Sequence, residues 1–130
     1  MSRSLVLVVD DDRTVRTVLH YMLEDWGYRV RTAADGGSLA IALAEQPNLI
    51  LLDVNMPGMD GVQISRHLRA RPETAHIPII CLSAGLARGI REGMIADEWL
   101  AKPFSSEQLA EALARWVEAP TEPAHSRRTE

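Results

Sequence analysis

The sequence predicts an α/β fold in which five parallel strands form one doubly wound sheet with helices on both faces. Short apolar runs at residues 5–9, 49–52 and 77–82 are typical of strands that are buried on both faces. Residues 28–32 alternate between apolar and polar, as a strand with one exposed face does, and residues 98–101 indicate a brief fifth strand. The segments between these runs carry apolar residues at helical spacing, so strands and helices alternate strictly along the chain. This (βα)5 alternation favours a parallel sheet with right-handed crossovers, and 130 residues are enough for one such domain.

The strands are short, and most of them end at polar residues. We expect them at residues 5–9, 28–32, 49–52, 77–82 and 98–101. Three aspartates follow the first strand, and the third runs directly into Asp53. The fourth ends at Ser83, and the fifth runs into Lys102. Polar side chains therefore collect at the carboxyl ends of the strands.

Five helices are expected between and after these strands. The apolar positions that predict them span residues 15–26, 39–43, 62–68, 84–96 and 109–117. An aspartate precedes the first helix as an N-cap and Gly27 stops it, whereas Ser105 or Ser106 caps the last one. Trp26 and Trp116 fall at core-facing positions of the first and last helices.

Composition excludes several classes of function. The net charge is −4 with scattered basic residues, so nothing predicts a nucleic-acid partner. No apolar run approaches the roughly 18 residues of a membrane span, and the N-terminus lacks the features of a signal peptide. The single cysteine, Cys81, excludes an internal disulfide and fits a cytoplasmic protein.

The carboxyl edge of the predicted sheet is the place where open α/β sheets bind ligands. The side chains that should meet there are those of Asp10, Asp11, Asp53, Ser83 and Lys102. Two carboxylates about 5 Å apart repel by roughly 3 kcal/mol at an effective dielectric constant near 20. Three acids therefore need more positive charge than one lysine supplies. Oxygen ligands of this kind suit Mg²⁺, so the sequence predicts a magnesium site.

Four features, in order along the chain, point to one family. They are the acidic pair after a valine-rich strand, LLDVNMPGMDG at 51–61, a serine after the fourth strand, and WLAKPF at 99–104. Together they resemble the receiver domain of bacterial two-component response regulators, over residues 4–118. The resemblance implies a flavodoxin-like three-layer sandwich and a receiver domain at residues 1–118. Residues 119–130 are polar and without periodicity, and we expect a disordered tail there.

The resemblance also implies a role for each polar residue of the site. Asp53 would be the phosphoacceptor, which attacks a phosphohistidine of a partner kinase and becomes an acyl phosphate. Asp11 and Asp53 would bind Mg²⁺ directly, together with the backbone carbonyl of Asn55, whereas Asp10 would act through a water molecule. Lys102 would pair with a phosphoryl oxygen. The peptide bond that follows this lysine is usually cis in the family.

Two residues would report the phosphorylation. Ser83 would hydrogen-bond another phosphoryl oxygen, and Trp99 occupies the position of the family's switch aromatic, which is usually Tyr or Phe. An indole is larger and its N–H needs a partner when buried, so we expect Trp99 to respond little or to stay on one side. The segment between Ser83 and Lys102 is a few residues shorter than is usual and contains glycines at 85, 89 and 93. Since each glycine costs a helix about 1 kcal/mol, we expect a short, irregular or mobile fourth helix.

The expected partners are a histidine kinase or phosphotransfer protein and a downstream protein that contacts residues 84–118. The chain would be a phosphoacceptor that dephosphorylates itself, not a turnover enzyme. The methionine start and polar tail favour a stand-alone regulator over a piece of a longer protein.

Two alternatives stay open. Residues 10–14 fit the DxDxT pattern of haloacid-dehalogenase-like phosphatases, with Asp10 as nucleophile, although Asp53 then has no role. The other alternative is a receiver-like interaction module that never accepts phosphate. Among the neighbouring residues, we expect Asp12 to cap the first helix and Arg13 and Arg88 to be solvated charges.

Overall fold

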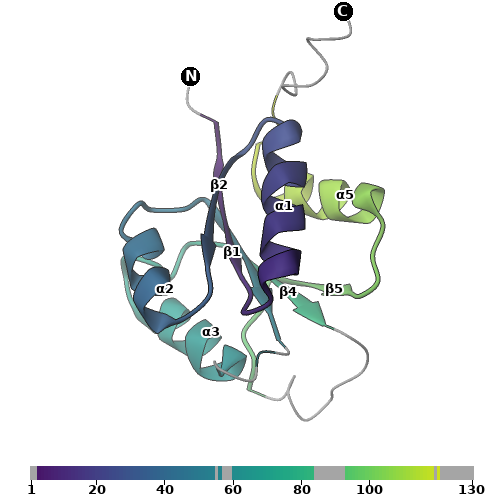
Figure 1. Ribbon diagram of the computed structural model, residues 1–130. Helices are drawn as coiled ribbons and strands as arrows, with labels where there is room; N and C mark the ends of the chain where they lie inside the picture. The colour runs from purple at the N-terminus through teal and green to yellow at the C-terminus, as the bar shows by residue number, and fades with distance from the viewer. Residues whose placement is uncertain (1–2, 55, 57–59, 84–92, 119, 121–130) are drawn as a thin grey trace, which may run out of the picture.

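The structure is a computed structural model that describes residues 3–54, 56, 60–83, 93–118 and 120. Strands and helices alternate as predicted as far as the fourth strand, and the fifth strand is followed by the last helix. In chain order they are β1 (Leu5–Val9), α1 (Arg13–Asp25), β2 (Arg29–Ala33), α2 (Gly36–Leu43), β3 (Leu49–Asp53), α3 (Gly61–Ala70), β4 (Ile79–Ser83), β5 (Glu98–Ala101) and α5 (Ser106–Trp116). Helices α1 and α5 cover one face of the sheet and α2 and α3 cover the other (Figure 1). No helix in the described part of the chain is long and apolar enough to cross a membrane.

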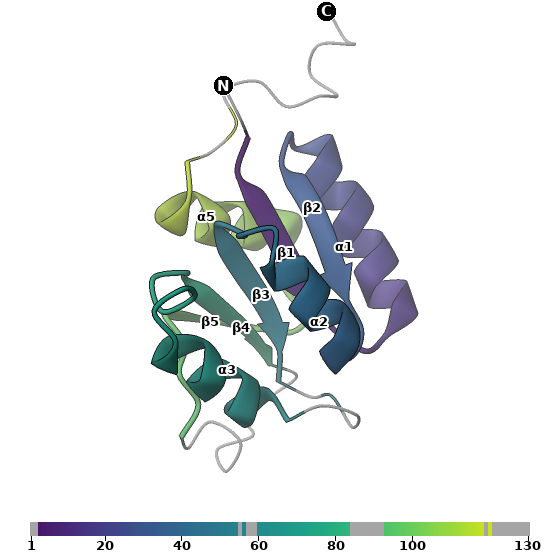
Figure 2. The same ribbon diagram turned by 90° about the vertical axis from the view of Figure 1, so that its left-hand side faces the viewer.

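The five strands form one parallel sheet in the order β2-β1-β3-β4-β5 (Figure 2). Strand β1 pairs with β2 on one side and with β3 on the other, so that Val8 lies opposite both Thr32 and Leu51. The direction of winding reverses between β1 and β3, which places a ligand crevice at the carboxyl ends of these two strands. This topology confirms the predicted doubly wound α/β fold.

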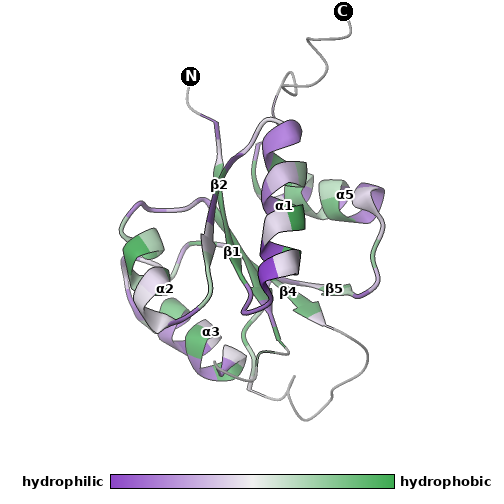
Figure 3. Ribbon diagram, in the orientation of Figure 1, coloured by the Kyte–Doolittle hydropathy of each residue, from purple (hydrophilic) through white to green (hydrophobic). Residues whose placement is uncertain are grey.

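The central strands are buried on both faces, as their unbroken apolar runs predict. Alternate side chains of β1, β3 and β4 point into two separate cores. One core lies under α1 and α5, and the other under α2 and α3. Figure 3 shows β1 and β4 as predominantly hydrophobic, whereas α1, α3 and α5 have hydrophilic residues as well. The two cores hold the strand ends, and the side chains that extend from them, in a fixed position.

Capping side chains fix where the helices begin. Asp12 accepts hydrogen bonds from the backbone N–H groups of Thr14 and Val15, and this confirms it as the cap of α1. Ser105 forms a capping box with Gln108 at the start of α5. Because Asp12 is the cap, α1 starts at Arg13, two residues after the acidic pair Asp10 and Asp11.

Several expectations about individual segments need correction. Strand β2 is one residue later than predicted, and β4 starts at Ile79 and not at residue 77. Residues 84–92 of the expected fourth helix lie outside the described residues, and residues 93–96 are not helical. Gly93 has a φ of +79°, a left-handed conformation that does not occur inside a right-handed helix.

Two apolar side chains lie closer to solvent than their spacing predicts. Val18 of α1 is 52% exposed, and Trp116, the last residue of α5, is 40% exposed. Instead of pointing into the core, the Trp116 indole N–H donates to a Glu98 carboxylate oxygen at 2.6 Å. Arg115 donates to the same carboxylate. Trp26, by contrast, packs against the core as predicted.

The segment before β5 is bound to α3 and to the start of β4. Ser65 of α3 accepts a hydrogen bond from the Ile95 N–H at 3.1 Å. Asp97 accepts from the Ile79 N–H at 2.8 Å and from the Arg69 guanidinium at 2.7 Å. The Asp97 N–H in turn donates to the Ile79 carbonyl. These bonds fix the path of the chain into β5 and hence towards Lys102.

Candidate functional site

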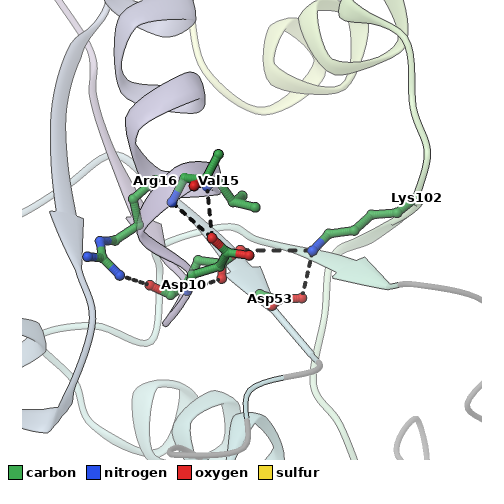
Figure 4. A network of polar contacts seen from close by, with 7 residues as sticks. Asp10, Val15, Arg16, Asp53 and Lys102 are labelled. Atoms are coloured by element: carbon green, nitrogen blue, oxygen red, sulfur yellow. Dashed lines mark hydrogen bonds and ion pairs between the residues drawn. The ribbon is translucent and has the colours of Figure 1, made fainter.

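The predicted polar residues meet at the carboxyl edge of the sheet. Asp10 follows β1, Asp53 ends β3, Ser83 ends β4 and Lys102 follows β5. The Lys102 ammonium lies 3.1 Å from an Asp53 carboxylate oxygen and 3.9 Å from Oδ2 of Asp10 (Figure 4). The Lys102 backbone N–H donates to the Ser83 carbonyl, which joins the ends of β4 and β5. The structure therefore brings together residues that lie up to 92 positions apart in the sequence.

Three carboxylates form the centre of this site. One oxygen from each of Asp10, Asp11 and Asp53 lies within 4.8 Å of the others. Asp10 and Asp53 are only 1% and 3% exposed, whereas Asp11 is half-buried. The site is thus a concentrated negative charge, shielded from water on one side and open on the other.

Asp10 is held from several directions. Its backbone N–H donates to the Ala33 carbonyl of β2 at 3.1 Å, and its carboxylate Oδ1 accepts from the Asp12 N–H at 2.9 Å. An Arg16 guanidinium N–H donates to its backbone carbonyl, also at 2.9 Å. The second carboxylate oxygen, Oδ2, is buried and accepts no hydrogen bond in the described part of the chain. The Lys102 ammonium lies 3.9 Å from that oxygen.

The surroundings of Asp10 oppose its ionisation. Burial raises the pKa of this carboxyl above its usual value, and the negative charges of Asp53 and Asp11 raise it further. The hydrogen bond from Asp12 and the charge of Lys102 lower the pKa in part. At Asp10, burial and the two neighbouring carboxylates thus outweigh the hydrogen bond from Asp12 and the charge of Lys102.

The donor set fits a hard divalent cation. The cluster offers only carboxylate oxygens, and one of them is a buried oxygen that accepts no hydrogen bond within the described chain. Buried acceptors are rarely left in this state unless they serve a ligand or water. Mg²⁺ takes a few carboxylate oxygens and keeps several waters, which a half-open site allows. The residues present therefore fit Mg²⁺.

The remaining predicted residues are placed less completely. Ser83 is 1% exposed at the end of β4. Trp99 lies in β5, is half-buried and packs against the core under α2 and α3. The Lys102–Pro103 peptide bond is cis, as the resemblance implies. Asn55, Arg88 and residues 119 and 121–130 lie outside the described residues.

One contact of the site was not predicted from the sequence. Arg16 lies on α1 and reaches back to the Asp10 carbonyl (Figure 4). Its distance of six residues from Asp10 gives no motif, although an arginine one turn after a helix cap is a signal that could have suggested such a bond.

Comparison with known proteins agrees with this geometry. The profile of one family, the response regulator receiver domain, matches residues 6–114. The chain belongs to this family. The receiver is 39% identical over 110 residues to the phosphate regulon transcriptional regulatory protein PhoB of Rhizobium meliloti, covering 80% of this chain and 48% of that one. It is 42% identical over 108 residues to the response regulator PleD of Caulobacter vibrioides, covering 80% and 24%.

Solved structures give the same result. The receiver superposes on the chemotaxis protein CheY4 of Vibrio cholerae with a TM-score of 0.80 and 34% identity, covering 89% of this chain and all of that one. The receiver domain of the sensor histidine kinase PA1611 of Pseudomonas aeruginosa gives a TM-score of 0.77 and 36% identity, covering 88% and 98%. That structure has a magnesium ion in its active-site cleft.

These findings settle the fold and the class of function. The protein is a response regulator receiver domain with a flavodoxin-like α/β fold, and neither alternative is favoured. The phosphatase pattern also loses its last acid, because Asp12 caps α1. The chain spans about half the length of the curated relative PhoB.

Proposed function

We propose that this receiver accepts a phosphoryl group on Asp53, with Mg²⁺, from a histidine kinase or a phosphotransfer protein. The observation that carries the proposal is the placement of Asp53. Asp53 is 3% exposed at the end of β3, and its carboxylate lies 3.1 Å from the Lys102 ammonium and within 4.8 Å of two further carboxylates. A buried strand end of this kind holds the carboxylate still while the open side admits a phosphohistidine.

The metal would be held by the acidic cluster. Asp11 and Asp53 are the proposed direct ligands, Asp10 the proposed ligand through water, and the backbone carbonyl of Asn55 a further one. When bound, Mg²⁺ supplies positive charge that offsets the repulsion between the acceptor carboxylate and the incoming phosphoryl oxygens. The support is the oxygen-only donor set and the buried Asp10 Oδ2, which accepts no hydrogen bond from the described residues.

The transfer requires one bond to form and one to break. An Asp53 carboxylate oxygen attacks phosphorus, the P–N bond to the partner's imidazole breaks, and the imidazole leaves with its electron pair. Lys102 already lies beside the attacking carboxylate, so its ammonium is in place to bind a phosphoryl oxygen. Ser83 would donate its hydroxyl to another oxygen from the end of β4. Catalysis here is mainly positioning and charge compensation.

The product is an acyl phosphate and not a released molecule. Because the acceptor is consumed in each transfer, the receiver does not turn over as an enzyme, and hydrolysis of the acyl phosphate resets it. We further propose that residues 84–118 carry the signal to a downstream protein, with Ser83 and Trp99 as the switch residues. One relative is described as a DNA-binding regulator, RpaA of Synechocystis. With a net charge of −4, this domain itself would not contact nucleic acid.

Intact-mass spectrometry tests the proposal. The wild-type protein should gain one phosphoryl group when it is incubated with acetyl phosphate and Mg²⁺, and none when EDTA replaces the metal. The Asp53→Asn variant should gain none under either condition. Asp25→Asn, at the far end of α1, is a matched control that should be phosphorylated like the wild type. Equal phosphorylation of the Asp53→Asn variant would contradict the proposal.

A further inference from the structure

Arg16 makes a contact that the phosphotransfer chemistry does not require. Its side chain extends from α1 towards the end of β1, where Nη1 donates to the Asp10 carbonyl at 2.9 Å (Figure 4). Its backbone N–H donates to the Asp12 carbonyl at 3.0 Å. The backbone bond belongs to the first turn of α1 and any residue other than proline at this position makes it, so only the side-chain bond to the Asp10 carbonyl depends on arginine.

The carbonyl that accepts this bond belongs to the peptide group between Asp10 and Asp11. The next peptide group, between Asp11 and Asp12, is fixed as well, because its N–H donates to Asp10 Oδ1 at 2.9 Å. Both peptide groups that flank Asp11 thus have a defined orientation. Asp11 is only half-buried, so packing against other side chains does not by itself fix its position. The two oriented peptide groups of its backbone restrict where its carboxylate can lie.

The acids would move apart without such a constraint. Asp10, Asp11 and Asp53 have oxygens within 4.8 Å of one another, and their mutual repulsion favours separation whenever no cation is present. Holding ligands at their bound spacing lowers the cost of binding the ion. Groups that orient metal ligands without touching the metal typically contribute 10–100-fold in affinity.

We propose that Arg16 is a positioning residue that strengthens Mg²⁺ binding, although it is itself a cation. The inference rests on the proposed function, because it assumes that the acidic cluster binds Mg²⁺. Arg16 acts through the backbone between Asp10 and Asp11 and not through its charge.

The direction of the charge effect makes the proposal testable. A positive charge near a cation site weakens cation binding, so its removal alone would strengthen binding. The charged groups that shift the Asp10 pKa are Asp53, Lys102 and Asp11, whereas the charge of Arg16 acts on Asp35. Loss of the hydrogen bond and loss of the charge therefore predict opposite changes in affinity.

Isothermal titration calorimetry with MgCl₂ measures the difference directly. It is done on the unphosphorylated protein, at a temperature at which circular dichroism shows every variant to be folded. We expect Arg16→Met, which keeps the aliphatic part but has no donor, to raise the Kd about 10-fold or more. Arg13→Met is the matched control. Arg13 lies on the same helix, and its side chain and that of Arg16 line one groove of about 250 Å³. Its replacement should leave the Kd unchanged or slightly lower.

An unchanged or lower Kd for Arg16→Met would overturn the proposal. If that variant does not fold, Arg16→Gln takes its place with the same expected result, because the shorter side chain cannot span the distance to the carbonyl. Absence of Mg²⁺ binding by the wild type would overturn the proposed metal site instead. The two failures are therefore distinguishable.

Discussion

Replacement of Asp10 by Asn should stabilise the metal-free protein at neutral pH. Asp10 is 1% exposed and lies in a cluster of three carboxylates. Asn has nearly the same shape, and its side-chain oxygen can still accept the hydrogen bond that Asp10 Oδ1 receives from the Asp12 N–H. The substitution therefore removes a buried charge and keeps the local structure.

The distances in the site give the size of the effect. One carboxylate oxygen of Asp10 and one of Asp53 lie within 4.8 Å of each other, so at an effective dielectric constant of about 20 they repel by at least about 3.5 kcal/mol. The attraction between Asp10 and Lys102 at 3.9 Å is about 4 kcal/mol on the same scale, so these two contributions nearly cancel. The cost of burying the Asp10 charge and the screened repulsion from half-exposed Asp11 remain. We expect a net gain of about 1–3 kcal/mol in the free energy of unfolding.

The pH dependence has a defined sign. Since the pKa of Asp10 is raised above 3.8 in the folded protein, its proton stabilises the wild type below pH 3.8. That stabilisation is lost as the pH rises through the raised pKa. The advantage of Asp10→Asn should therefore be absent at the acidic end and appear towards neutral pH.

Urea denaturation in EDTA, followed by circular dichroism, measures this difference. Glu73→Gln is the control, because Glu73 is an exposed carboxylate at the opposite edge of the sheet, and its replacement should change stability little. Addition of Mg²⁺ should stabilise the wild type more than Asp10→Asn. A metal-free Asp10→Asn variant that is less stable than the wild type at pH 7 would refute the electrostatic reasoning.

Three further predictions concern the rest of the molecule. Asp97→Ala should lower the free energy of unfolding by about 1–3 kcal/mol, because the Ile79 N–H of β4 and the Arg69 guanidinium lose their acceptor. Urea denaturation measures this change, and an unchanged midpoint would argue against the role of Asp97. Cys81 is buried, and burial raises the pKa of its thiol to about 12. It should therefore react with a thiol reagent only as fast as the protein unfolds, and rapid labelling of the native protein would contradict this expectation. In a variant in which the other two tryptophans are replaced by Phe, the fluorescence of Trp99 should change little on addition of Mg²⁺ and a phosphoryl mimic, because its indole already packs against the core. A large shift in the emission of Trp99 would disprove this expectation.

Much of the fold was predictable because its strands are buried on both faces. Unbroken apolar runs locate β1 and β3 within a residue, and the polar residues that follow them indicate the site edge. Helix boundaries follow from the caps, as Asp12 shows. The least exact strand boundary is the start of β4, which was expected at residue 77 and lies at Ile79. Strand β2, an edge strand with alternating exposure, is shifted by one residue.

Errors occurred where the tertiary environment outweighs local spacing. Periodicity places Trp116 on the buried face of α5, but at the end of the helix its indole N–H has a closer partner in Glu98. A helix through residues 93–96 fails because Gly93 takes a left-handed conformation and the segment instead hydrogen-bonds to α3.

The aspartates and the lysine of the candidate site were each predicted from the sequence. Topology alone brings the strand ends together, so Asp10, Asp53 and Lys102 were expected to meet. The bond from Arg16 to the Asp10 carbonyl was not predictable in this way, because it depends on the rotamer of a long side chain.

The most direct measurement is the position of the phosphoryl group. After incubation with acetyl phosphate and Mg²⁺, borohydride reduces an aspartyl phosphate to homoserine, which tandem mass spectrometry locates in the digested protein. We expect homoserine at position 53 and at no other aspartate. Homoserine at position 10 or 11, with none at 53, would contradict it and would favour a different nucleophile in the same cluster.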